Sequence, residues 1–417
     1  MNLKIAYITL GCKLNYAETS TYERELSKAG FEAVPWSKGA DVFVVNTCTV
    51  TEHSDKKSRN IIRKLHRQNP HAKIFVTGCS AQLRRADYEE IEGVVRVFGA
   101  TEKSMVVPYI IQHTSGTDCC GHDISTFFPA YSSGERTRSF LKVQDGCDYK
   151  CHYCTVPYAR GESRNIPIAD IIPQAEAIAA EGIKEIVLTG VNTGDFGKST
   201  GETFFDLIKQ LNEVEGIERY RISSIEPNLL TEEMIDWIVT GTKFLPHYHI
   251  PLQSGCDTIL KEMGRRYDTA AFADKIQYIR EKTEVQGGPK VFFGIDVIVG
   301  FPGETDELFM ETYNFLKDVV KPAFIHIFPY SRRAGTPAAE RKDQVQDSIK
   351  TNRVQMLEEL SAALHQEFLE ANKGVAEKVL FESTDKNGMM EGYTGNYIRI
   401  SRPYDPGLIG KIVDIVI

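Results

Sequence analysis

Short apolar runs recur along the first hundred residues, and each is followed by a segment with helical spacing. Residues 3–10 alternate loosely between apolar and polar side chains, and residues 14–30 then show a helical pattern that ends in glycine. β-Branched runs at residues 41–47 and 73–78, and another near residue 100, repeat the unit. Strands that alternate with helices favour an α/β domain with a parallel sheet, where ligands collect beyond the carboxyl ends of the strands.

A second and longer series of apolar runs follows. Six predicted strands separated by helical stretches fit a partial (βα)6 barrel of the TIM type, whose active site lies at the carboxyl ends of the strands. The predicted strands of this barrel are residues 139–143, 185–190, 219–225, 247–253, 291–300 and 323–330.

The end of the chain has a different pattern. A long charged helical segment at residues 342–373 ends at Gly374. Short alternating strands joined by Gly- and Asn-bearing turns then predict a small all-β barrel. Residues 101–135 show little periodicity and are interpreted as a linker or an edge extension. The predicted division is an N-terminal domain at 1–112, a linker at 113–136, a barrel with its C-terminal helix at 137–373, and the β-module at 374–417.

The composition changes this picture little. A chain of 417 residues with 42% hydrophobic and 25% charged residues is ordinary for a soluble protein of two or three domains. No segment has the pattern of a membrane span or a signal peptide. Nine cysteines, an odd number spread over this length, do not form a disulfide framework. We therefore expect a cytoplasmic protein without a membrane partner.

The charge distribution adds a candidate binding surface. The net charge of −8 argues against indiscriminate nucleic-acid binding, but it does not exclude a local basic face. Residues 55–68, DKKSRNIIRKLHRQ, have six Lys and Arg side chains against one Asp, with apolar residues at helical spacing. A solvated surface helix is the plain interpretation. The basic excess favours phosphate binding, with Lys57, Arg63 and Lys64 as the candidates.

The strongest chemical signal is GCDYKCHYCTVPYARG at residues 146–161. Cys147, Cys151 and Cys154 lie close enough for one loop to turn three thiolates towards one metal centre. A four-iron cubane takes four ligands, so three cysteines leave one iron open to a small molecule. Structural zinc needs a fourth ligand, and the one candidate, His152, lies between two cysteines where its direction conflicts with theirs. A disulfide would leave one thiol unexplained.

This Cys-x3-Cys-x2-Cys loop, with Tyr153 before its last cysteine, resembles the signature of the radical SAM enzymes. The resemblance implies a 4Fe-4S cluster whose open iron chelates S-adenosyl-L-methionine (SAM). An electron from the cluster then gives methionine and a 5'-deoxyadenosyl radical. The resemblance also implies that barrel strand ends hold SAM, which makes candidates of Gly190, Asn192, Ser223, Gln253 and Ile298.

A second cysteine set lies in the N-terminal domain. Cys12, Cys48 and Cys79 each directly follow a predicted strand, so all three are expected on the same edge of the sheet. A lone cysteine there is usually a small buried residue. Three in register favour a second cluster, again with one iron lacking a protein ligand. No ligand role is assigned to Cys119, Cys120 or Cys256, and Cys256 is expected to be packed.

The six cysteines together extend the resemblance. With GC at 11–12, NTC at 46–48 and TGC at 77–79, the chain resembles the methylthiotransferases over essentially its whole length. Their parts are a methylthiotransferase domain, a radical SAM barrel and a TRAM domain. TLGCKLNYAETS and NTCTVTEHSDKKSRN resemble most the branch that acts on N6-threonylcarbamoyladenosine at position 37 of tRNA.

This resemblance implies a methylthio group added at C2 of that adenine, with sulfur held at an auxiliary cluster on Cys12, Cys48 and Cys79. The implied cofactors are two 4Fe-4S clusters and SAM. The implied partners are the tRNA anticodon stem-loop, a low-potential electron donor and a sulfur donor. In the β-module, Tyr397 and Arg399 are candidates for RNA stacking and phosphate pairing, and structural tyrosines are the alternative.

Other functions stay open on sequence alone. The same architecture serves isopentenyladenosine tRNA and a ribosomal-protein aspartate. A different class, a non-catalytic metal-stabilised RNA-binding protein, is also compatible with these motifs. Iron content and SAM cleavage separate that class from an enzyme.

Overall fold

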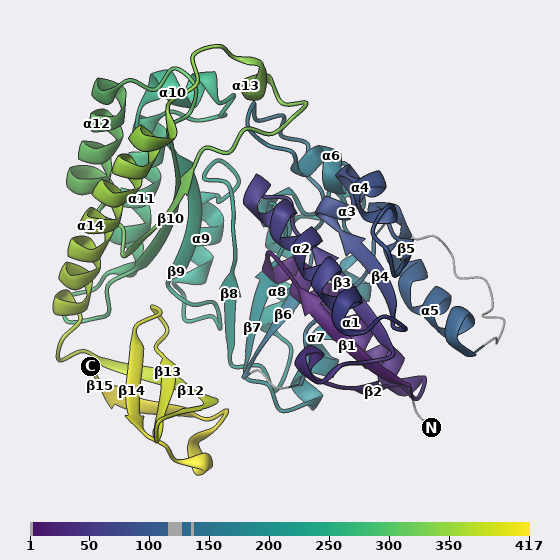
Figure 1. Ribbon diagram of the computed structural model, residues 1–417. Helices are drawn as coiled ribbons and strands as arrows, with labels where there is room; N and C mark the ends of the chain where they lie inside the picture. The colour runs from purple at the N-terminus through teal and green to yellow at the C-terminus, as the bar shows by residue number, and fades with distance from the viewer. Residues whose placement is uncertain (1–2, 116–126, 135–136) are drawn as a thin grey trace.

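The computed structural model describes residues 3–115, 127–134 and 137–417 and arranges them in three parts (Figure 1). Cys119 and Cys120 lie outside the described residues, as does much of the predicted linker. The N-terminal domain packs beside the barrel, and the C-terminal β-module lies at one end of it.

The N-terminal domain is built on a parallel sheet, as the alternating pattern predicts. β-Branched and aromatic side chains bury both of its faces: Val42 and Val44 point to one face, and Phe43 and Val45 to the other. The strand order is β2 (Glu32–Ala33), β1 (Lys4–Thr9), β3 (Val42–Thr47), β4 (Lys73–Gly78), β5 (Val94–Val97).

Helices cover both faces of this sheet. α1 (Lys13–Lys28) packs on one face and α2 (Glu52–Gln68) on the other, while the short α3 (Cys79–Leu83) and α4 (Arg85–Glu89) follow β4. The expectation of a linker or edge extension from residue 101 is wrong at its start. There a 3-10 turn, Ala100–Met105, leads into α5 (Val106–Ser115), whose Val106 and Ile110 are buried against the α1 face. The helix therefore crosses the predicted boundary at residue 112.

The six barrel strands are confirmed, but they form two sheets. β6 (Arg138–Lys142), β7 (Glu185–Thr189) and β8 (Arg219–Ile222) make one, and β9 (His247–Gln253), β10 (Phe292–Val299) and β11 (Phe324–Pro329) make the other. Between β8 and β9 the connection includes a bridge from Tyr220 to Phe244 and a bond from Ile225 N to His249 O of 3.2 Å. The two sheets therefore adjoin at this point through irregular pairing.

The barrel helices pack outside the strands around a large apolar core that includes Ile186, Leu188, Ile250 and Ile295. These helices are α7 (Ile168–Ala180), α8 (Phe204–Asn212), α9 (Glu232–Ile238), α10 (Asp257–Glu262), α11 (Thr269–Thr283), α12 (Asp306–Asn314) and α14 (Asp347–Ala371).

The predicted C-terminal β-module is a curled antiparallel sheet in the order β14 (Arg399–Pro403), β13 (Met389–Tyr393), β12 (Ala376–Lys386), β15 (Ile412–Val416). Buried arginines of β8 attach it to the barrel. Arg221 donates to the carbonyls of Gly395 at 2.9 Å and Thr394 at 2.8 Å, and Arg219 donates to the carbonyl of Tyr393 at 3.2 Å.

Among the described residues, no helix has both the length and the apolar composition that crossing a membrane requires.

Candidate active site

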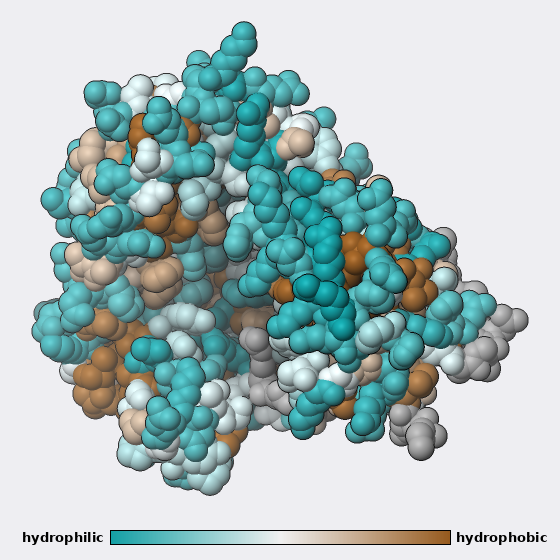
Figure 2. All heavy atoms as spheres, viewed as in Figure 1, coloured by the Kyte–Doolittle hydropathy of each residue, from teal (hydrophilic) through white to brown (hydrophobic). Residues whose placement is uncertain are grey.

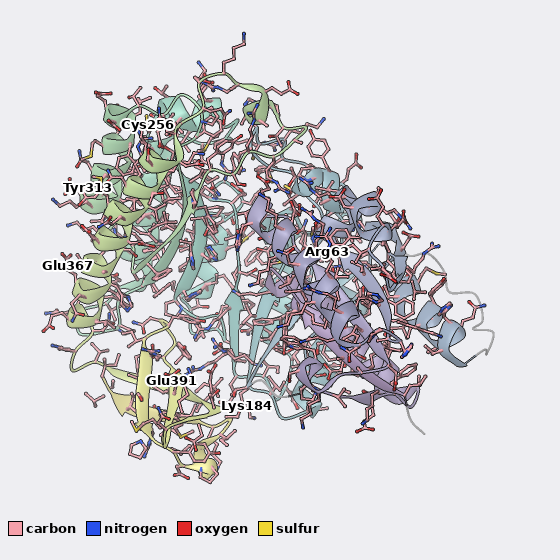
Figure 3. All side chains as sticks on the ribbon, in the orientation of Figure 1. Arg63, Lys184, Cys256, Tyr313, Glu367 and Glu391 are labelled. Carbon is pink, nitrogen blue, oxygen red and sulfur yellow. The ribbon has the colours of Figure 1, made fainter. Side chains whose placement is uncertain are left out.

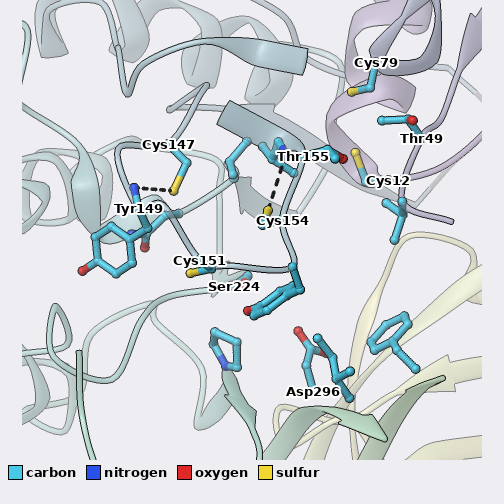
Figure 4. Close-up of a pocket in the computed structure, with 18 of the residues that line it drawn as sticks. Cys12, Thr49, Cys79, Cys147, Tyr149, Cys151, Cys154, Thr155, Ser224 and Asp296 are labelled. Atoms are coloured by element: carbon cyan, nitrogen blue, oxygen red, sulfur yellow. Dashed lines mark hydrogen bonds between the residues drawn. The ribbon is translucent and has the colours of Figure 1, made fainter. Parts of the chain in front are cut away.

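One cavity of about 410 Å³ lies between the N-terminal domain and the barrel, and both cysteine sets line it (Figure 4). The barrel loop contributes one triad, and the edge of the N-terminal sheet contributes the other. Two sites predicted separately from the sequence therefore open on one space. The sulfur-bearing residues are Cys12, Cys48, Cys79, Cys147, Cys151 and Cys154.

The barrel loop is held closed at its base. Gly146 has a φ of 72°, and a Cβ there would lie 1.9 Å from the carbonyl oxygen of Glu162. Only glycine permits this approach. The Cys147 N–H donates to the carbonyl of Gly161 at 3.1 Å, which joins the two ends of the loop. The loop that bears the three cysteines is therefore closed at its base, and all three sulfur-bearing residues line the same cavity.

Each sulfur of this barrel triad accepts a hydrogen bond. Backbone N–H groups donate to Cys147 Sγ at 3.4 Å from Tyr149 and to Cys154 Sγ at 3.5 Å from Val156. Arg265 Nη1 donates to Cys151 Sγ at 3.2 Å. Hydrogen bonds to the sulfurs are among the features that set the properties of iron–sulfur clusters.

Arg265 is held in place by its own partners. Its guanidinium donates to the Tyr267 hydroxyl at 3.0 Å and forms a buried ion pair with Glu226. Burial raises the pKa of the Glu226 carboxyl and Arg265 opposes that effect. The sequence pattern did not single out Arg265, which comes from a segment more than a hundred positions after the cysteine loop.

The auxiliary triad is also built on a close approach at glycine. Gly11 has a φ of 98°, and a Cβ there would lie 2.7 Å from Cys48 Cβ. The backbone before Cys12 thus packs directly against Cys48. Arg160 Nε donates to Cys79 Sγ at 3.2 Å, so a second arginine, from the end of the barrel loop, reaches the auxiliary triad.

The thiols fit the iron–sulfur clusters that the resemblance implies. The cysteines of the described residues are all free of disulfides. Burial raises the pKa of Cys48 and Cys147 to about 11 and that of Cys154 to about 12, so these thiols are protonated at neutral pH until a metal displaces the proton. Soft thiolates in sets of three suit an open Fe–S cluster.

His152 does not provide the fourth ligand that a zinc site at the barrel cysteines would need. His152 Nδ1 lies 2.7 Å from the carbonyl oxygen of Glu262, and the His152 side chain is not among the residues that line the cavity. Cys256 likewise stays apart: it is buried at the start of α10 and packs against Ile259 and Phe301 (Figure 3).

Four of the five SAM candidates line the cavity: Gly190, Asn192, Gln253 and Ile298. Ser223 does not, and its neighbour Ser224 takes that place. The Asn192 side-chain nitrogen is buried and has no hydrogen-bond partner among the described residues, so it offers a donor to a polar ligand.

A buried ionic network fixes the two triads relative to each other. Glu18 of α1 accepts from Lys103 at 2.7 Å, Lys142 at 2.9 Å and Arg160 at 3.2 Å. Asp145, beside the cysteine loop, accepts from Lys142 at 2.7 Å and Arg160 at 2.8 Å. Burial alone would raise the pKa of the Glu18 carboxyl, but the three cations hold it far below its ordinary value. Residues of both domains thus share one network.

The basic face predicted at residues 55–68 lies on α2. Lys57, Arg63 and Lys64 are exposed and form no ion pair with any described residue. Figure 2 shows hydrophilic residues gathered over α2, and Figure 3 shows Arg63 on this helix. The one acid counted in that segment, Asp55, is buried and accepts from Arg333 at 2.8 Å. The exposed basic side chains are therefore free to meet phosphates.

The two RNA candidates of the β-module lie in different settings. Tyr397 packs between the module and the barrel, with its ring centroid 4.9 Å from that of His247 and its hydroxyl accepting from Arg138 at 3.3 Å. This position favours the structural alternative for Tyr397. Arg399 is exposed and lies 3.4 Å from Glu391.

Two family models and several named proteins are similar to this chain. The family described as "Uncharacterized protein family UPF0004" matches residues 4–99, and the "Radical SAM superfamily" matches residues 141–316. A Bacillus subtilis (strain 168) protein named threonylcarbamoyladenosine tRNA methylthiotransferase MtaB is 40% identical, over 99% of this chain and 93% of that protein. The chain belongs to the radical SAM methylthiotransferase family.

Further relatives show the range of this family. A MtaB protein of Aquifex aeolicus (strain VF5) is 36% identical over the full length of both chains. A protein of Natranaerobius thermophilus named tRNA-2-methylthio-N(6)-dimethylallyladenosine synthase is 30% identical over 99% of this chain and 94% of that protein.

The solved structure of the radical S-adenosylmethionine methyltransferase TsrM from Kitasatospora setae shares the fold. Its TM-score is 0.58 at 14% identity, over 81% of this chain and 77% of that chain. As a radical SAM methylthiotransferase, this enzyme uses SAM and 4Fe-4S clusters.

Proposed function

We propose that this enzyme attaches a methylthio group to C2 of N6-threonylcarbamoyladenosine at position 37 of tRNA. The observation that carries the proposal is that one cavity receives both cysteine triads, in a chain that matches MtaB-named relatives over its full length. Relatives named for dimethylallyladenosine are 30–32% identical and define the alternative substrate.

Each triad has its own role in the proposal. Cys147, Cys151 and Cys154 would hold the cluster that binds SAM, and Cys12, Cys48 and Cys79 would hold the auxiliary cluster; all six line the cavity. When bound, these cofactors supply radical chemistry that removes an unactivated hydrogen, which acid–base side chains cannot do, and the methylthio group that replaces it.

The protein's own side chains position this chemistry. Arg265 and Arg160 each donate to one sulfur and so neutralise part of the negative charge of each site. Gly190 and Asn192 lie at the carboxyl end of β7, where the buried amide of Asn192 is available to SAM. The network around Glu18 keeps both triads on the same cavity.

Recognition of RNA is assigned to α2. The helix begins at Glu52, shortly after Cys48, so a phosphate backbone along Lys57, Arg63 and Lys64 passes near the auxiliary triad. An anticodon-loop base is reachable without opening a duplex, because it is already single-stranded. Arg399 is a further candidate for a phosphate contact.

The proposal also covers the donors of electrons and sulfur, the location in the cell and the domain boundaries. It requires two partners: a low-potential electron donor for the cluster that Cys147, Cys151 and Cys154 would hold, and a sulfur donor for the cluster that Cys12, Cys48 and Cys79 would hold. A cytoplasmic location is supported by the unpaired cysteines of the described residues. The family matches at 4–99 and 141–316 support functional units at 1–112 and 137–373, with a TRAM-type unit at 374–417 and a linker at 113–136.

Mass spectrometry of tRNA nucleosides from cells with and without this protein tests the proposal. The methylthio form of threonylcarbamoyladenosine is expected only where the protein is present. An unchanged nucleoside profile would contradict the proposal, and loss of the methylthio form of the dimethylallyl nucleoside would favour the alternative substrate.

A further inference from the structure

A polar cluster lies on the inner face of the barrel beside the cysteine cavity. His249 of β9, Asp296 of β10 and His326 of β11 each offer one ligand atom, all within 4.8 Å of one another. His249 Nε2 lies 2.7 Å from Asp296 Oδ1, and the two imidazole rings stack with centroids 4.8 Å apart. Asp296 also lines the cavity (Figure 4), so the cluster continues the cavity along the barrel.

The inner face around this cluster is open. Phe328 lines the cavity, and strand alternation places His326 and Phe324 on the same face of β11. Phe324 and Phe328 are 42% and 39% exposed although they lie on a barrel strand. Exposed aromatic rings next to a polar cluster provide stacking surfaces for a planar group.

Lys13 of the N-terminal domain lies near enough to the cluster to interact with it electrostatically. It is the first residue of α1, directly after Cys12, and its charge acts on Asp296 and on His326. Lys13 forms no ion pair or hydrogen bond with any described residue. The arginines near it are paired: Arg138 lies 2.6 Å from Glu382, and Arg221 lies 2.8 Å from Glu185. Of these three cations, Lys13 is thus the one without an ion pair to a described residue.

The histidines complement this cation. Burial, with His249 acting in the same direction, lowers the pKa of His326 to about 4, so its ring is neutral at neutral pH. A neutral imidazole offers one donor and one acceptor nitrogen. Asp296 uses one carboxylate oxygen for His249 and keeps the other for a further donor. A ligand with an anionic group, a hydroxyl and N–H donors matches this set.

We propose that Lys13, His249, Asp296 and His326 form a subsite for the threonylcarbamoyl side chain of the modified adenosine. In this assignment Lys13 pairs with the threonyl carboxylate, Asp296 accepts from a ureido N–H, and His326 bonds the hydroxyl. The inference rests on the proposed function and makes it more specific, because a dimethylallyl group has none of these polar atoms. A site built to bond polar groups rejects an apolar analogue strongly, since its own groups are then left unpaired.

A bound metal ion is the other use of two histidines and an aspartate. The hydrogen bond from His249 to Asp296 and the stacking of the two rings favour an organic ligand, because both arrangements already occupy the groups without an ion. Metal content is therefore measured in the test.

The test measures anaerobic binding of the reconstituted enzyme to anticodon stem-loop RNAs. One RNA has threonylcarbamoyladenosine, a second has its threonyl carboxamide, which lacks the negative charge, and a third has unmodified adenosine. The wild-type enzyme is expected to bind the carboxamide about 10-fold more weakly, as befits the loss of one charge-assisted hydrogen bond. Equal affinity of the wild-type enzyme for acid and carboxamide would overturn the proposal.

Variants then test whether Lys13 causes the preference for the carboxylate over the carboxamide. Lys13→Met is expected to bind acid and carboxamide alike, whereas Lys28→Met, at the exposed far end of the same helix, keeps the wild-type preference. Retention of the preference in Lys13→Met would exclude Lys13. Because Lys13 adjoins Cys12, the iron content of this variant is compared with that of the wild type.

His326→Phe provides an independent arm, since it keeps a ring against His249 and removes only the ring nitrogens. It is expected to lose the preference of the wild type for threonylcarbamoyl over 2-aminobutyrylcarbamoyl, which differs from it only by lacking the hydroxyl. An unchanged preference, or a stoichiometric metal other than iron that disappears in His326→Phe, would overturn the assignment. If the wild-type enzyme forms the methylthio product but does not discriminate between the threonyl carboxylate and the carboxamide, only the subsite is wrong. If it forms no product from any RNA, the proposed function is wrong.

Discussion

At the scale of single residues, the charge near the sulfurs is set by two arginines that come from different parts of the chain. Arg265 donates to Cys151 Sγ, and Arg160 donates to Cys79 Sγ. A cation beside a sulfur stabilises the more negative, reduced state of a cluster. Both arginines are therefore expected to raise the reduction potential of the site that they contact.

Replacing Arg265 by Met tests this effect. The loss of one charge-assisted hydrogen bond, about 1.5–3 kcal/mol, corresponds to a potential about 60–130 mV more negative for a one-electron couple. A redox titration followed by electron paramagnetic resonance measures the shift. Arg266→Met is the control, because the Arg266 guanidinium lies over the Tyr149 ring at 3.8 Å. An equal shift in both variants would show that Arg265 has no specific role.

Single cysteine changes separate the roles of the triads. Cys48→Ala is expected to keep cleavage of SAM to 5'-deoxyadenosine while abolishing the methylthio product, and Cys151→Ala is expected to abolish both. Iron should fall from about eight to about four atoms per chain when either triad is removed completely, given four irons in each cubane. Loss of 5'-deoxyadenosine formation in a Cys48→Ala protein that keeps its barrel cluster would contradict this division.

The local sequence was sufficient to predict both groups of cysteines, but it was insufficient to predict the residues that hydrogen-bond to them. Cys147, Cys151 and Cys154 share one loop, and Cys12, Cys48 and Cys79 each follow a strand, so spacing alone predicts both groups. Arg265 reaches Cys151 across more than a hundred positions, and no periodic pattern identifies such a residue. Ser223 shows the opposite limit: one position along the chain after β8 decides that Ser224, and not Ser223, lines the cavity.

At the scale of elements, α2 combines burial on one side with unpaired charge on the other. Ile62 and Leu65 pack against the sheet, and Lys57, Arg63 and Lys64 are exposed. The helix pattern predicted both faces because each depends on spacing within one segment.

Replacing Lys57, Arg63 and Lys64 by Ala is expected to weaken tRNA binding and to flatten its dependence on salt. Each lost phosphate contact should reduce the slope of log K against log salt by about 0.9 for duplex regions. The control replaces Lys28, Lys209 and Lys317, which are exposed on other elements. A salt slope equal to that of the wild type, with SAM cleavage intact, would remove α2 from the RNA interface.

Two features of the elements were not predictable from local patterns. The run containing Val106 and Ile110 lacks helical alternation because the helix is buried along much of its surface, so its pattern resembled an irregular segment. The six barrel strands were predicted, but the interruption of pairing between β8 and β9 was not. Strand pairing depends on neighbours distant in sequence, and no local pattern encodes such an interruption.

At the scale of the whole molecule, the Glu18 network determines how the two cluster domains meet. The substitution Glu18→Gln removes the one carboxylate that pairs with all three of Lys103, Lys142 and Arg160. Lys103 then loses its ion-pair partner, whereas Lys142 and Arg160 keep Asp145, and an unpaired buried cation is expected to cost about 3–5 kcal/mol of unfolding free energy. Urea unfolding under anaerobic conditions measures the loss, and Lys56→Gln, which breaks an exposed pair with Glu52, is the control with a small effect.

The pH dependence of this loss has a definite sign. Because the folded-state pKa of Glu18 is lowered by its cations, its stabilising contribution is complete above the unfolded value of about 4.3 and declines as pH falls below it. The difference between wild type and Glu18→Gln is therefore expected to be largest near neutral pH and to shrink in acid. A difference that grew in acid would contradict the charge assignment.

Methylthiolation of threonylcarbamoyladenosine in tRNA by this enzyme can be measured in a single reaction in vitro. Purified enzyme, reconstituted anaerobically with iron and sulfide, is given SAM, a reductant and tRNA with or without the threonylcarbamoyl group. Digested nucleosides are then analysed by mass spectrometry. We expect the methylthio nucleoside from the threonylcarbamoyl tRNA and none from the unmodified or dimethylallyl tRNA. Equal product from dimethylallyl tRNA, or no product from any tRNA, would overturn the proposed function.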